Sequence, residues 1–295
     1  MLESIGEPLR CKAKDTNPTG IEQEPDPQES RAGCFKAARG TFNAMADVQT
    51  RRMHSSLKFP LRLFASLLVL LPVGVAQQVS FHITPVRPVD ELRAEALKEQ
   101  PPQEQGAFLK PDLVELVTLD STIKLDIRYA TTNNFLGTPV YTQARAFLQR
   151  PAAEALLRAH RELKAQGYGL IIHDGYRPWY VTRIFWDATP ADKHIFVADP
   201  ASGSKHNRGC AVDLSLYDLK TGQEVDMPSG YDEMTERAYA DYPGGTDQQR
   251  ALRLLLRQAM EKQGFAVIPK EWWHFDYKDW KQYPIQNAKF EDLGQ

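Results

Sequence analysis

Apolar residues occupy every second position of the segment 210–216. Because successive side chains of a strand point to opposite faces, this alternation predicts a half-buried strand that carries Asp213 on its polar face. The segment 273–277 alternates in the same way, with aromatic residues at its odd-numbered positions. It predicts a second strand whose polar face carries His274.

Two longer segments have the periodicity and the ends of helices. Pro151 suits the first turn of a helix, where its missing N–H does no harm, and Gly167 follows the last turn. The predicted buried stripe of this helix consists of Leu156, Leu157, His160 and Leu163. His160 is therefore expected to pack in the interior rather than to bind a metal. A second helix is predicted from about Asp247 to Gln263, ended by Gly264.

The remaining apolar runs are short and typical of strands. They are 113–119, 125–129, 170–173 and 265–268. Since strands and helices follow one another in mixed order, the sequence predicts an α+β fold, a small antiparallel sheet backed by helices. The polar residues of the strands would then place a functional site on the open face of the sheet.

The N-terminal region differs from the rest of the chain. Residues 1–50 mix Pro, Gly, Glu and Lys without apolar periodicity, a composition that cannot form a core and predicts disorder. Basic residues then lead into the apolar run 63–71, and small residues follow at 74–76, which is the pattern of a secretory signal peptide. The run is about ten residues, too short for a membrane-spanning helix of about 20. An anchor that stays uncleaved is the alternative.

This pattern divides the chain into four predicted segments. Because an export signal stands at the start of a chain, Met53 is the expected start, and residues 1–52 are expected to be a non-native upstream extension. Residues 53–76 form the predicted signal peptide. Residues 77–110 are predicted to be a linker or N-terminal arm with a short helix, and residues 111–295 the functional domain. The mature protein is expected to be periplasmic or secreted, without stable membrane insertion.

His206, Asp213 and His274 form a candidate set of metal ligands. Gly209 allows a sharp turn that aims the His206 imidazole and the Asp213 carboxylate at one point. Two imidazoles and one carboxylate leave one position of a tetrahedral zinc ion open for a water molecule. The pattern therefore predicts one zinc ion per chain in a hydrolase site on the open sheet face, with Glu271 as the candidate base.

Glu271, His173 and His194 carry side chains suited to the same chemistry. Glu271 is an odd number of positions from His274, so we expect it at the entrance of the strand, after Pro269. His173 is expected to pack at the end of its strand, because a fourth protein ligand would close the open position. His194, beside a lysine, is expected to be solvated.

Charge and cysteine content indicate which partners and disulfide bonds to expect. Lys and Arg number 36 against 38 Asp and Glu, and no basic patch predicts a nucleic-acid partner. Cys11 and Cys34 precede the predicted signal peptide, so the exported protein would keep only Cys210 and no internal disulfide. Cys210 is expected to behave as a small buried hydrophobe. The alternative is a role as zinc ligand or nucleophile.

The motif S-x-H-x-x-G-x-A-x-D at 204–213, followed by E-x-x-H at 271–274, resembles the zinc D-alanyl-D-alanine dipeptidase family. The resemblance runs from about residue 113 to 283 and includes four further segments. These are Asp126–Thr131, Asn134–Gly137, Val140–Tyr141 and Asp174–Pro178.

The resemblance assigns roles to the matched residues. It implies that the three candidate ligands bind zinc, that Glu271 is the general base and that Arg177 stabilises the transition state. Ser204, Asp174 and Tyr176 lie in the same motifs and are candidates for substrate binding.

The implied activity is zinc-dependent hydrolysis of the small peptide D-alanyl-D-alanine to two D-alanines, in cell-wall peptide turnover or salvage. A D,D- or L,D-carboxypeptidase acting on peptidoglycan stem peptides would use the same ligands. A non-catalytic zinc-containing wall-binding domain is a further alternative, and Glu271 and Arg177 favour an enzyme over it. For Arg177 the structural alternative is an ion pair with Asp174 or Asp199.

Overall fold

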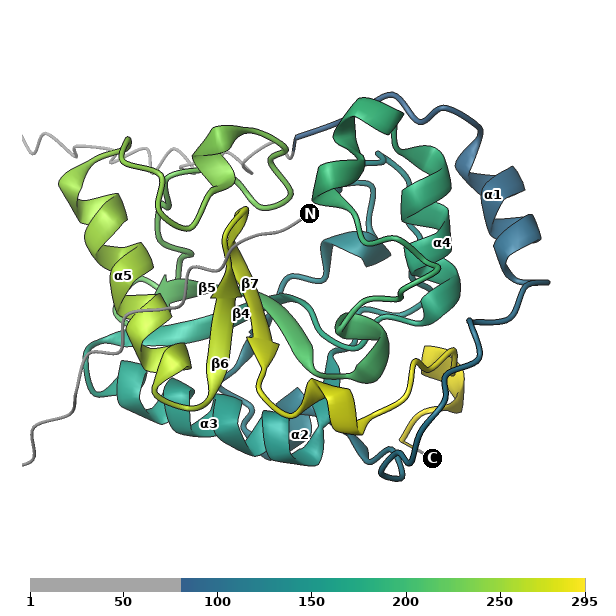
Figure 1. Ribbon diagram of the computed structural model, residues 1–295. Coiled ribbons are helices and arrows are strands. Elements are labelled where there is room, and N and C mark those ends of the chain that lie inside the picture. The colour runs from purple at the N-terminus through teal and green to yellow at the C-terminus, as the bar shows by residue number, and fades with distance from the viewer. Residues whose placement is uncertain (1–80, 295) are drawn as a thin grey trace, which may run out of the picture. The chain divides into compact units, whose positions relative to one another are not determined.

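Residues 81–294 are described by the computed structural model of the protein, whose elements Figure 1 shows. The predicted extension 1–52 and the predicted signal peptide 53–76 lie outside the described residues. In the described part of the chain, no helix is both long enough and apolar enough to cross a membrane.

The centre of the fold is a five-stranded sheet in the order β2-β4-β5-β7-β6, and β1 pairs with β3 in a separate two-stranded sheet. The strands are β1 (Leu113–Glu115), β2 (Lys124–Leu125), β3 (Phe147–Gln149), β4 (Tyr168–Asp174), β5 (Ala211–Asp218), β6 (Phe265–Ile268) and β7 (Glu271–Tyr277). Neighbouring strands are antiparallel except the short β2, which is parallel to β4. The predicted α+β class with a small antiparallel sheet is confirmed.

Helices pack on this sheet and around its ends. They are α1 (Val89–Ala96), α2 (Leu116–Leu119), α3 (Arg150–Lys164), α4 (Trp179–Ala188) and α5 (Asp247–Glu261). The predicted helices correspond to α3 and α5, which contact each other and the sheet. His160 of α3 is fully buried, and its Nδ1 accepts a hydrogen bond from the Leu170 N–H at 3.2 Å. The packing role predicted for it is confirmed.

Two segments predicted as strands are only partly strands. After β1 the chain forms the short helix α2, and the Thr118 hydroxyl donates to the carbonyl of Glu115, a local bond that competes with strand pairing. After β2 the chain turns into the 3₁₀ helix η1 (Arg128–Ala130). Arg128 forms an ion pair with Asp126 at 2.6 Å, which the turn permits.

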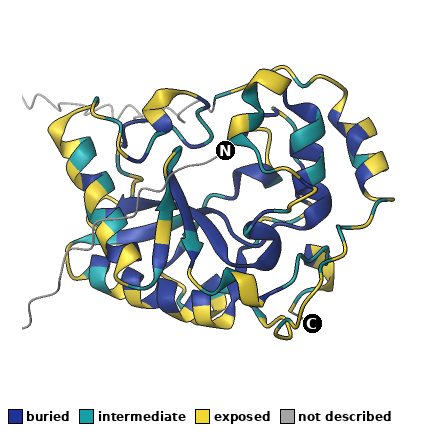
Figure 2. Cartoon of the chain, in the orientation of Figure 1, coloured by how far each residue is buried: buried dark blue, intermediate teal, exposed yellow. Residues whose placement is uncertain are grey.

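Strand β5 lies in the interior of the molecule (Figure 2), and the prediction that it is half-buried was wrong. Its residues Ala211–Tyr217 are all buried. The face that carries Asp213 is covered by the segment after β5, from which Tyr231 contacts Asp213. Alternation identified the polar face, but a buried polar face is possible when its groups find partners.

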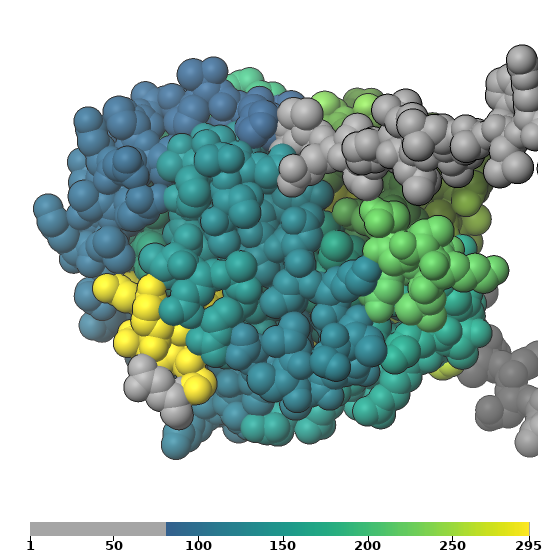
Figure 3. All heavy atoms as spheres, turned by 180° about the vertical axis from the view of Figure 1, so that it is seen from behind, coloured from purple at the N-terminus to yellow at the C-terminus, as the bar shows by residue number. Residues whose placement is uncertain are grey.

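The N-terminal arm contains the short helix α1, which packs against α4 with Leu92 only 1% exposed. Its flanks are tied by backbone bonds, from the Ile83 N–H to the carbonyl of Phe135 at 2.9 Å and from the Leu109 N–H to that of Gln282 at 2.8 Å. From behind, the C-terminal residues, yellow in Figure 3, lie on the same face as this blue arm.

Candidate active site and metal centre

The sheet brings two of the candidate ligands together. Asp213 of β5 is paired directly with His274 of β7. Residues that face each other across an antiparallel pair point to the same side of the sheet. The Asp213 Oδ1 and His274 Nδ1 atoms are 3.0 Å apart.

The third candidate ligand, His206, comes from the turn before β5. His206 begins the 3₁₀ helix η3 (His206–Arg208), and Gly209 follows its last residue with φ 68°, a left-handed conformation that favours glycine. A Cβ atom at Gly209 would lie 2.4 Å from Leu113 Cδ2. The turn brings His206 Nε2 to 3.3 Å from Asp213 Oδ1 and 3.1 Å from His274 Nδ1.

These three side chains have the chemistry and the geometry to hold a metal ion. One ligand atom from each lies within 4.8 Å of the others, and all three residues are buried. Oδ1 of Asp213 is buried and has no hydrogen-bond partner in the described structure. A buried carboxylate oxygen facing two imidazole nitrogens fits a cation between them, and two nitrogens with one carboxylate are a zinc donor set.

The polar atoms of the candidate ligands that face away from the cluster all have hydrogen-bond partners. His206 Nδ1 lies 2.7 Å from the carbonyl oxygen of Gly175, and His274 Nε2 lies 2.9 Å from Asp276 Oδ1. Because these outer nitrogens donate, the inner nitrogens are left as acceptors that can bind a metal. The Tyr231 hydroxyl donates to Asp213 Oδ2 at 3.0 Å.

Glu271 is the first residue of β7, as predicted, and its carboxylate reaches the same cluster. The β6–β7 register shifts between Val267 and Ile268, so Ile268 pairs with Glu271 while Val267 pairs with Phe275. This irregularity overcomes the odd spacing and places Glu271 Oε2 3.7 Å from His274 Nδ1. Burial raises the pKa of the Glu271 carboxyl to about 7.

Arg177 forms a close ion pair with Asp174 and also lies near Asp213. Its Nε and Nη2 atoms lie 2.9 and 2.8 Å from Asp174 Oδ2, and Nη2 lies 3.8 Å from Asp213 Oδ2. Burial alone would lower the pKa of the guanidinium, but the Asp174 carboxylate raises it well above its usual value. The predicted ion pair is with Asp174. Asp199 instead accepts a hydrogen bond from the Ala201 N–H.

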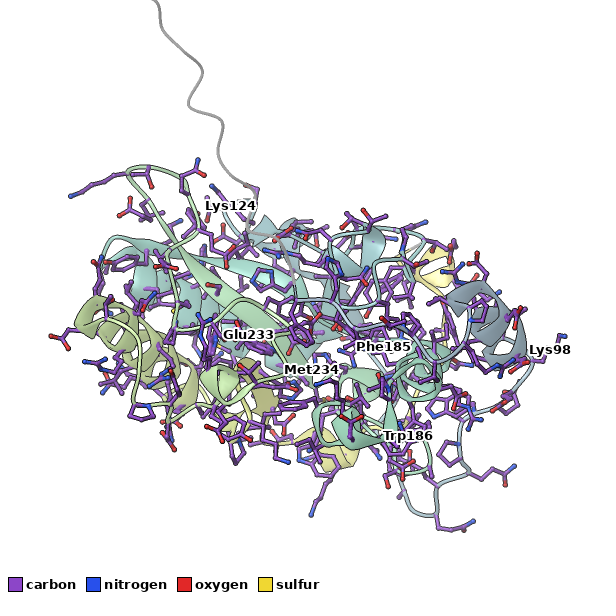
Figure 4. All side chains as sticks on the ribbon, turned by 90° about the horizontal axis from the view of Figure 1, so that it is seen from above. Lys98, Lys124, Phe185, Trp186, Glu233 and Met234 are labelled. Carbon is purple, nitrogen blue, oxygen red and sulfur yellow. The ribbon has the colours of Figure 1, made fainter. Side chains whose placement is uncertain are left out.

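A cavity of about 240 Å³ lies at this site. Its polar lining includes the three candidate ligands, Glu271 and Arg177. Apolar side chains complete the wall, among them Phe185 of α4 and Met234 from the loop before the 3₁₀ helix η4 (Glu236–Ala238), both labelled in Figure 4. The cavity is smaller than the usual range of about 300–1,000 Å³ for drug-sized ligands, which suits a small substrate.

Of the three candidate substrate-binding residues, only Ser204 borders the cavity. Its Oγ accepts a hydrogen bond from the His206 N–H at 3.2 Å. Asp174 is behind Arg177, where it also accepts from the Tyr141 hydroxyl at 2.7 Å. Tyr176 is fully buried away from the cavity and donates to the carbonyl of Ala288, so the structure does not support its predicted role.

His173, His194 and Cys210 lie outside the cluster of candidate ligands. His173 is buried in β4 and stacks on the Tyr231 ring. His194, expected to be solvated, instead stacks on Trp186 with ring centroids 3.9 Å apart. Cys210 is buried, and burial raises the pKa of its thiol to about 12, which fits a small hydrophobe rather than a nucleophile.

Sequence reasoning missed Asp232, which borders the cavity. Its φ is 60°, uncommon for a residue other than glycine although Asp tolerates it. Oδ1 accepts from the Tyr129 hydroxyl at 3.0 Å, while Oδ2 is buried without a partner in the described structure. Burial, with the neighbouring Asp213, raises the pKa of Asp232 well above its usual value. No periodic pattern marks this residue in the sequence.

Comparison with known proteins shows the family of this chain. The model of the D-ala-D-ala dipeptidase family matches residues 110–292. The chain belongs to this family. A D-alanyl-D-alanine dipeptidase of Escherichia coli is 36% identical over 179 residues, covering 61% of this chain and 91% of that protein. One of Enterococcus faecium is 37% identical over 187 residues, covering 57% and 91%. As a member of this family, the protein is a metallopeptidase.

Two solved structures are more distant. A vancomycin-resistance D,D-pentapeptidase, VanY, in complex with Zn(II) has 16% identity and a TM-score of 0.31, covering 48% of this chain and 78% of that one. The LdcB LD-carboxypeptidase has 18% identity and a TM-score of 0.34, covering 73% and 99%. At these scores the family assignment depends on the sequence relatives.

Proposed function

We propose that this dipeptidase family member is a zinc enzyme that hydrolyses D-alanyl-D-alanine to two D-alanines. The observation that carries the proposal is the convergence of His206, Asp213 and His274 in a small cavity that also holds Glu271 and Arg177. The names of the relatives supply the substrate. A wall-binding domain would not require a carboxyl such as that of Glu271 beside the candidate ligands.

Zinc held by the three ligands supplies Lewis acidity, which acidifies water and polarises a carbonyl group. Glu271, 3.7 Å from His274, takes the proton of the attacking water and passes it to the leaving amine. A pKa of about 7 suits both steps, because a group is most effective in proton transfer when its pKa is near the working pH.

Arg177 stabilises the charge that develops on the carbonyl oxygen. Its guanidinium is fixed by Asp174 at 2.8 Å and borders the cavity, so it needs little reorganisation during the reaction. Phe185 and Tyr129, whose rings lie 4.8 and 5.4 Å from the guanidinium carbon, keep this side of the site apolar. Charges interact more strongly where water is excluded.

Asp232 supplies a binding site for the substrate's free amino group. Its Oδ2 is buried, lacks a partner in the described structure and belongs to the cavity wall. An ammonium group would pair with this oxygen and stabilise the ionised carboxylate. An internal peptide segment has no free ammonium there, so this contact favours a free dipeptide.

Purified protein loaded with zinc should release two D-alanines from each D-Ala-D-Ala. L-Ala-D-Ala and a peptidoglycan stem pentapeptide are the comparison substrates, with D-alanine release as the readout. Faster release of only the C-terminal residue from the pentapeptide would replace the dipeptidase proposal with the carboxypeptidase alternative. Loss of D-Ala-D-Ala hydrolysis on removal of zinc, with recovery on its return, tests the metal.

The Glu271→Gln variant separates catalysis from metal binding. It should keep zinc and lose activity by about 10²–10⁴-fold, the usual contribution of a positioned acid–base group. His206→Ala should lose zinc as well as activity, because it removes a ligand. A zinc-free Glu271→Gln protein would show that Glu271 is not the base assigned here.

The biological setting we propose is export followed by turnover or salvage of wall peptides outside the cytoplasm. The support is the apolar run 63–71 followed by small residues at 74–76. Protein recovered from its host should therefore begin at or near Gln77. N-terminal sequencing tests this, and mature protein that retains residues 53–76 would contradict cleavage.

A further inference from the structure

Tyr231 connects the cluster of candidate ligands to a second group of charged side chains, centred on the buried His173. On one side its hydroxyl donates to Asp213 Oδ2 at 3.0 Å. On the other side its ring stacks on the His173 imidazole, with centroids 4.7 Å apart and planes at 23°. Tyr231 is 4% exposed and His173 is fully buried. The contact between these groups is therefore shielded from solvent.

His173 is held by two carboxylates. Its Nδ1 lies 3.5 Å from Asp126 Oδ2, and its Nε2 lies 3.3 Å from Glu224 Oε1. Acidic oxygens at both ring nitrogens favour the imidazolium form. Burial opposes that charge, but Asp126 and Glu224 outweigh it and raise the pKa of His173 to about 9. Arg128, 2.6 Å from Asp126, adds a second cation to the cluster.

We propose that Tyr231 is a positioning residue of the metal site, which holds Asp213 through Oδ2 so that only Oδ1 faces the metal. His173 in turn fixes the ring of Tyr231. The inference depends on the proposed metal site and names residues beyond the ligands and the base.

The two oxygens of Asp213 differ in the way this role requires. Oδ2 receives the Tyr231 hydrogen bond, while Oδ1 is buried, free of hydrogen bonds in the described structure and 3.0 Å from His274 Nδ1. A carboxylate with one oxygen engaged is expected to bind through the other alone. Donors behind a ligand orient it and tune its basicity, and their loss commonly weakens metal binding by about 10–100-fold.

If Tyr231 had only a packing role, its ring would matter and its hydroxyl would not. Its ring also packs against Trp273 and Tyr129, at centroid distances of 5.6 and 6.0 Å. A phenylalanine ring would keep these contacts and the stacking on His173. The Tyr231→Phe substitution therefore removes the hydroxyl and little else.

The experiment measures zinc affinity of the full-length protein by competition with a chelating dye. Tyr231→Phe should raise the zinc dissociation constant about 10-fold. Tyr217→Phe is the matched control: this residue is also buried, and its hydroxyl donates to the carbonyl of Thr122, away from the cluster. The control should bind zinc like the wild type. The Tm of each zinc-free protein reports any general loss of stability.

A double-mutant cycle tests the part assigned to His173. His173→Gln should weaken zinc binding in the wild-type background and have little further effect in the Tyr231→Phe background, because it acts through the tyrosine. Equal losses in both backgrounds would overturn that part of the proposal.

The outcomes also separate this inference from the proposed function. If the wild type binds zinc and Tyr231→Phe binds it equally tightly, the positioning role is wrong and the zinc enzyme stands. If the wild type binds no zinc, the proposed function fails first, and the inference fails with it.

Discussion

At the scale of single residues, Arg177 both forms a buried ion pair and borders the cavity. Asp174 occupies one side of its guanidinium at 2.8 Å, and the cavity occupies the other. Asp174 is itself held by the Tyr141 hydroxyl and the Gly175 N–H. The geometry of Arg177 is therefore set before substrate arrives, as electrostatic stabilisation of a transition state requires.

Replacing Arg177 by Lys keeps the charge and removes the planar fork that meets Asp174. We expect kcat to fall by about 10²–10³-fold with little change in KM, as for the loss of a single oxyanion donor. Steady-state kinetics on D-Ala-D-Ala gives both constants. A raised KM with kcat nearly intact would instead assign Arg177 to binding the carboxylate of the substrate.

His173 should make stability depend on pH. Its folded pKa of about 9 is above the unfolded value of about 6.5, so its contribution is complete below pH 6.5 and is lost as the pH rises through 9. Urea denaturation of the wild type should show this loss between pH 6.5 and 9.5. His173→Gln should be less stable at pH 6.5 and lose less over the same interval. Parallel curves for the two proteins would argue against a charged His173.

At the scale of elements, the turn that carries His206 is supported from the N-terminal arm. Glu104 Oε1 lies 2.5 Å from Arg208 Nη2, and Glu104 Oε2 accepts from the Ile285 N–H at 2.7 Å. Arg208 ends the same 3₁₀ helix that His206 begins. The family match starts only at residue 110, so this support comes from a part of the chain before it.

Glu104→Gln should destabilise the protein by about 1–3 kcal/mol, because Arg208 is buried and would lose its charged partner. The matched control is Glu99→Gln in the same arm, where the ion pair with Arg183 is longer, 3.6 Å, and more exposed. That change should cost less than about 1 kcal/mol. Urea denaturation measures the stability of both variants. Equal losses would show that the Glu104–Arg208 pair contributes no more than the exposed Glu99–Arg183 pair.

At the scale of the whole molecule, metal binding should contribute to stability. A ligand that binds only the folded state at 100 times its dissociation constant stabilises that state by about 2.7 kcal/mol. Chelation of zinc should therefore lower Tm by about 5–10 °C for a domain of this size. Calorimetry with and without chelator measures the shift. His206→Ala should have a low Tm that zinc does not change.

The sequence by itself determined the helices α3 and α5, the strands β5 and β7, and the residues of the candidate metal site. These depend on local information: periodicity identifies which residues share a face, and Gly209 marks a turn that few residues other than glycine adopt. The alternation placed Asp213 and His274 on the polar faces of two predicted strands, and in the structure these two residues pair directly.

Only the tertiary structure decided what surrounds that site. Tyr231 and Asp232 come from a segment without periodicity, whose conformation is set by packing over β5 rather than by its own pattern. Tyr176, which its motif made a candidate for substrate binding, instead packs against Phe290 and donates to the carbonyl of Ala288 near the C-terminus. A buried carboxylate such as Asp213 must find partners wherever the fold supplies them, and those partners are distant in sequence. The pattern along the chain therefore predicted the candidate ligands, and the fold determined which groups contact them.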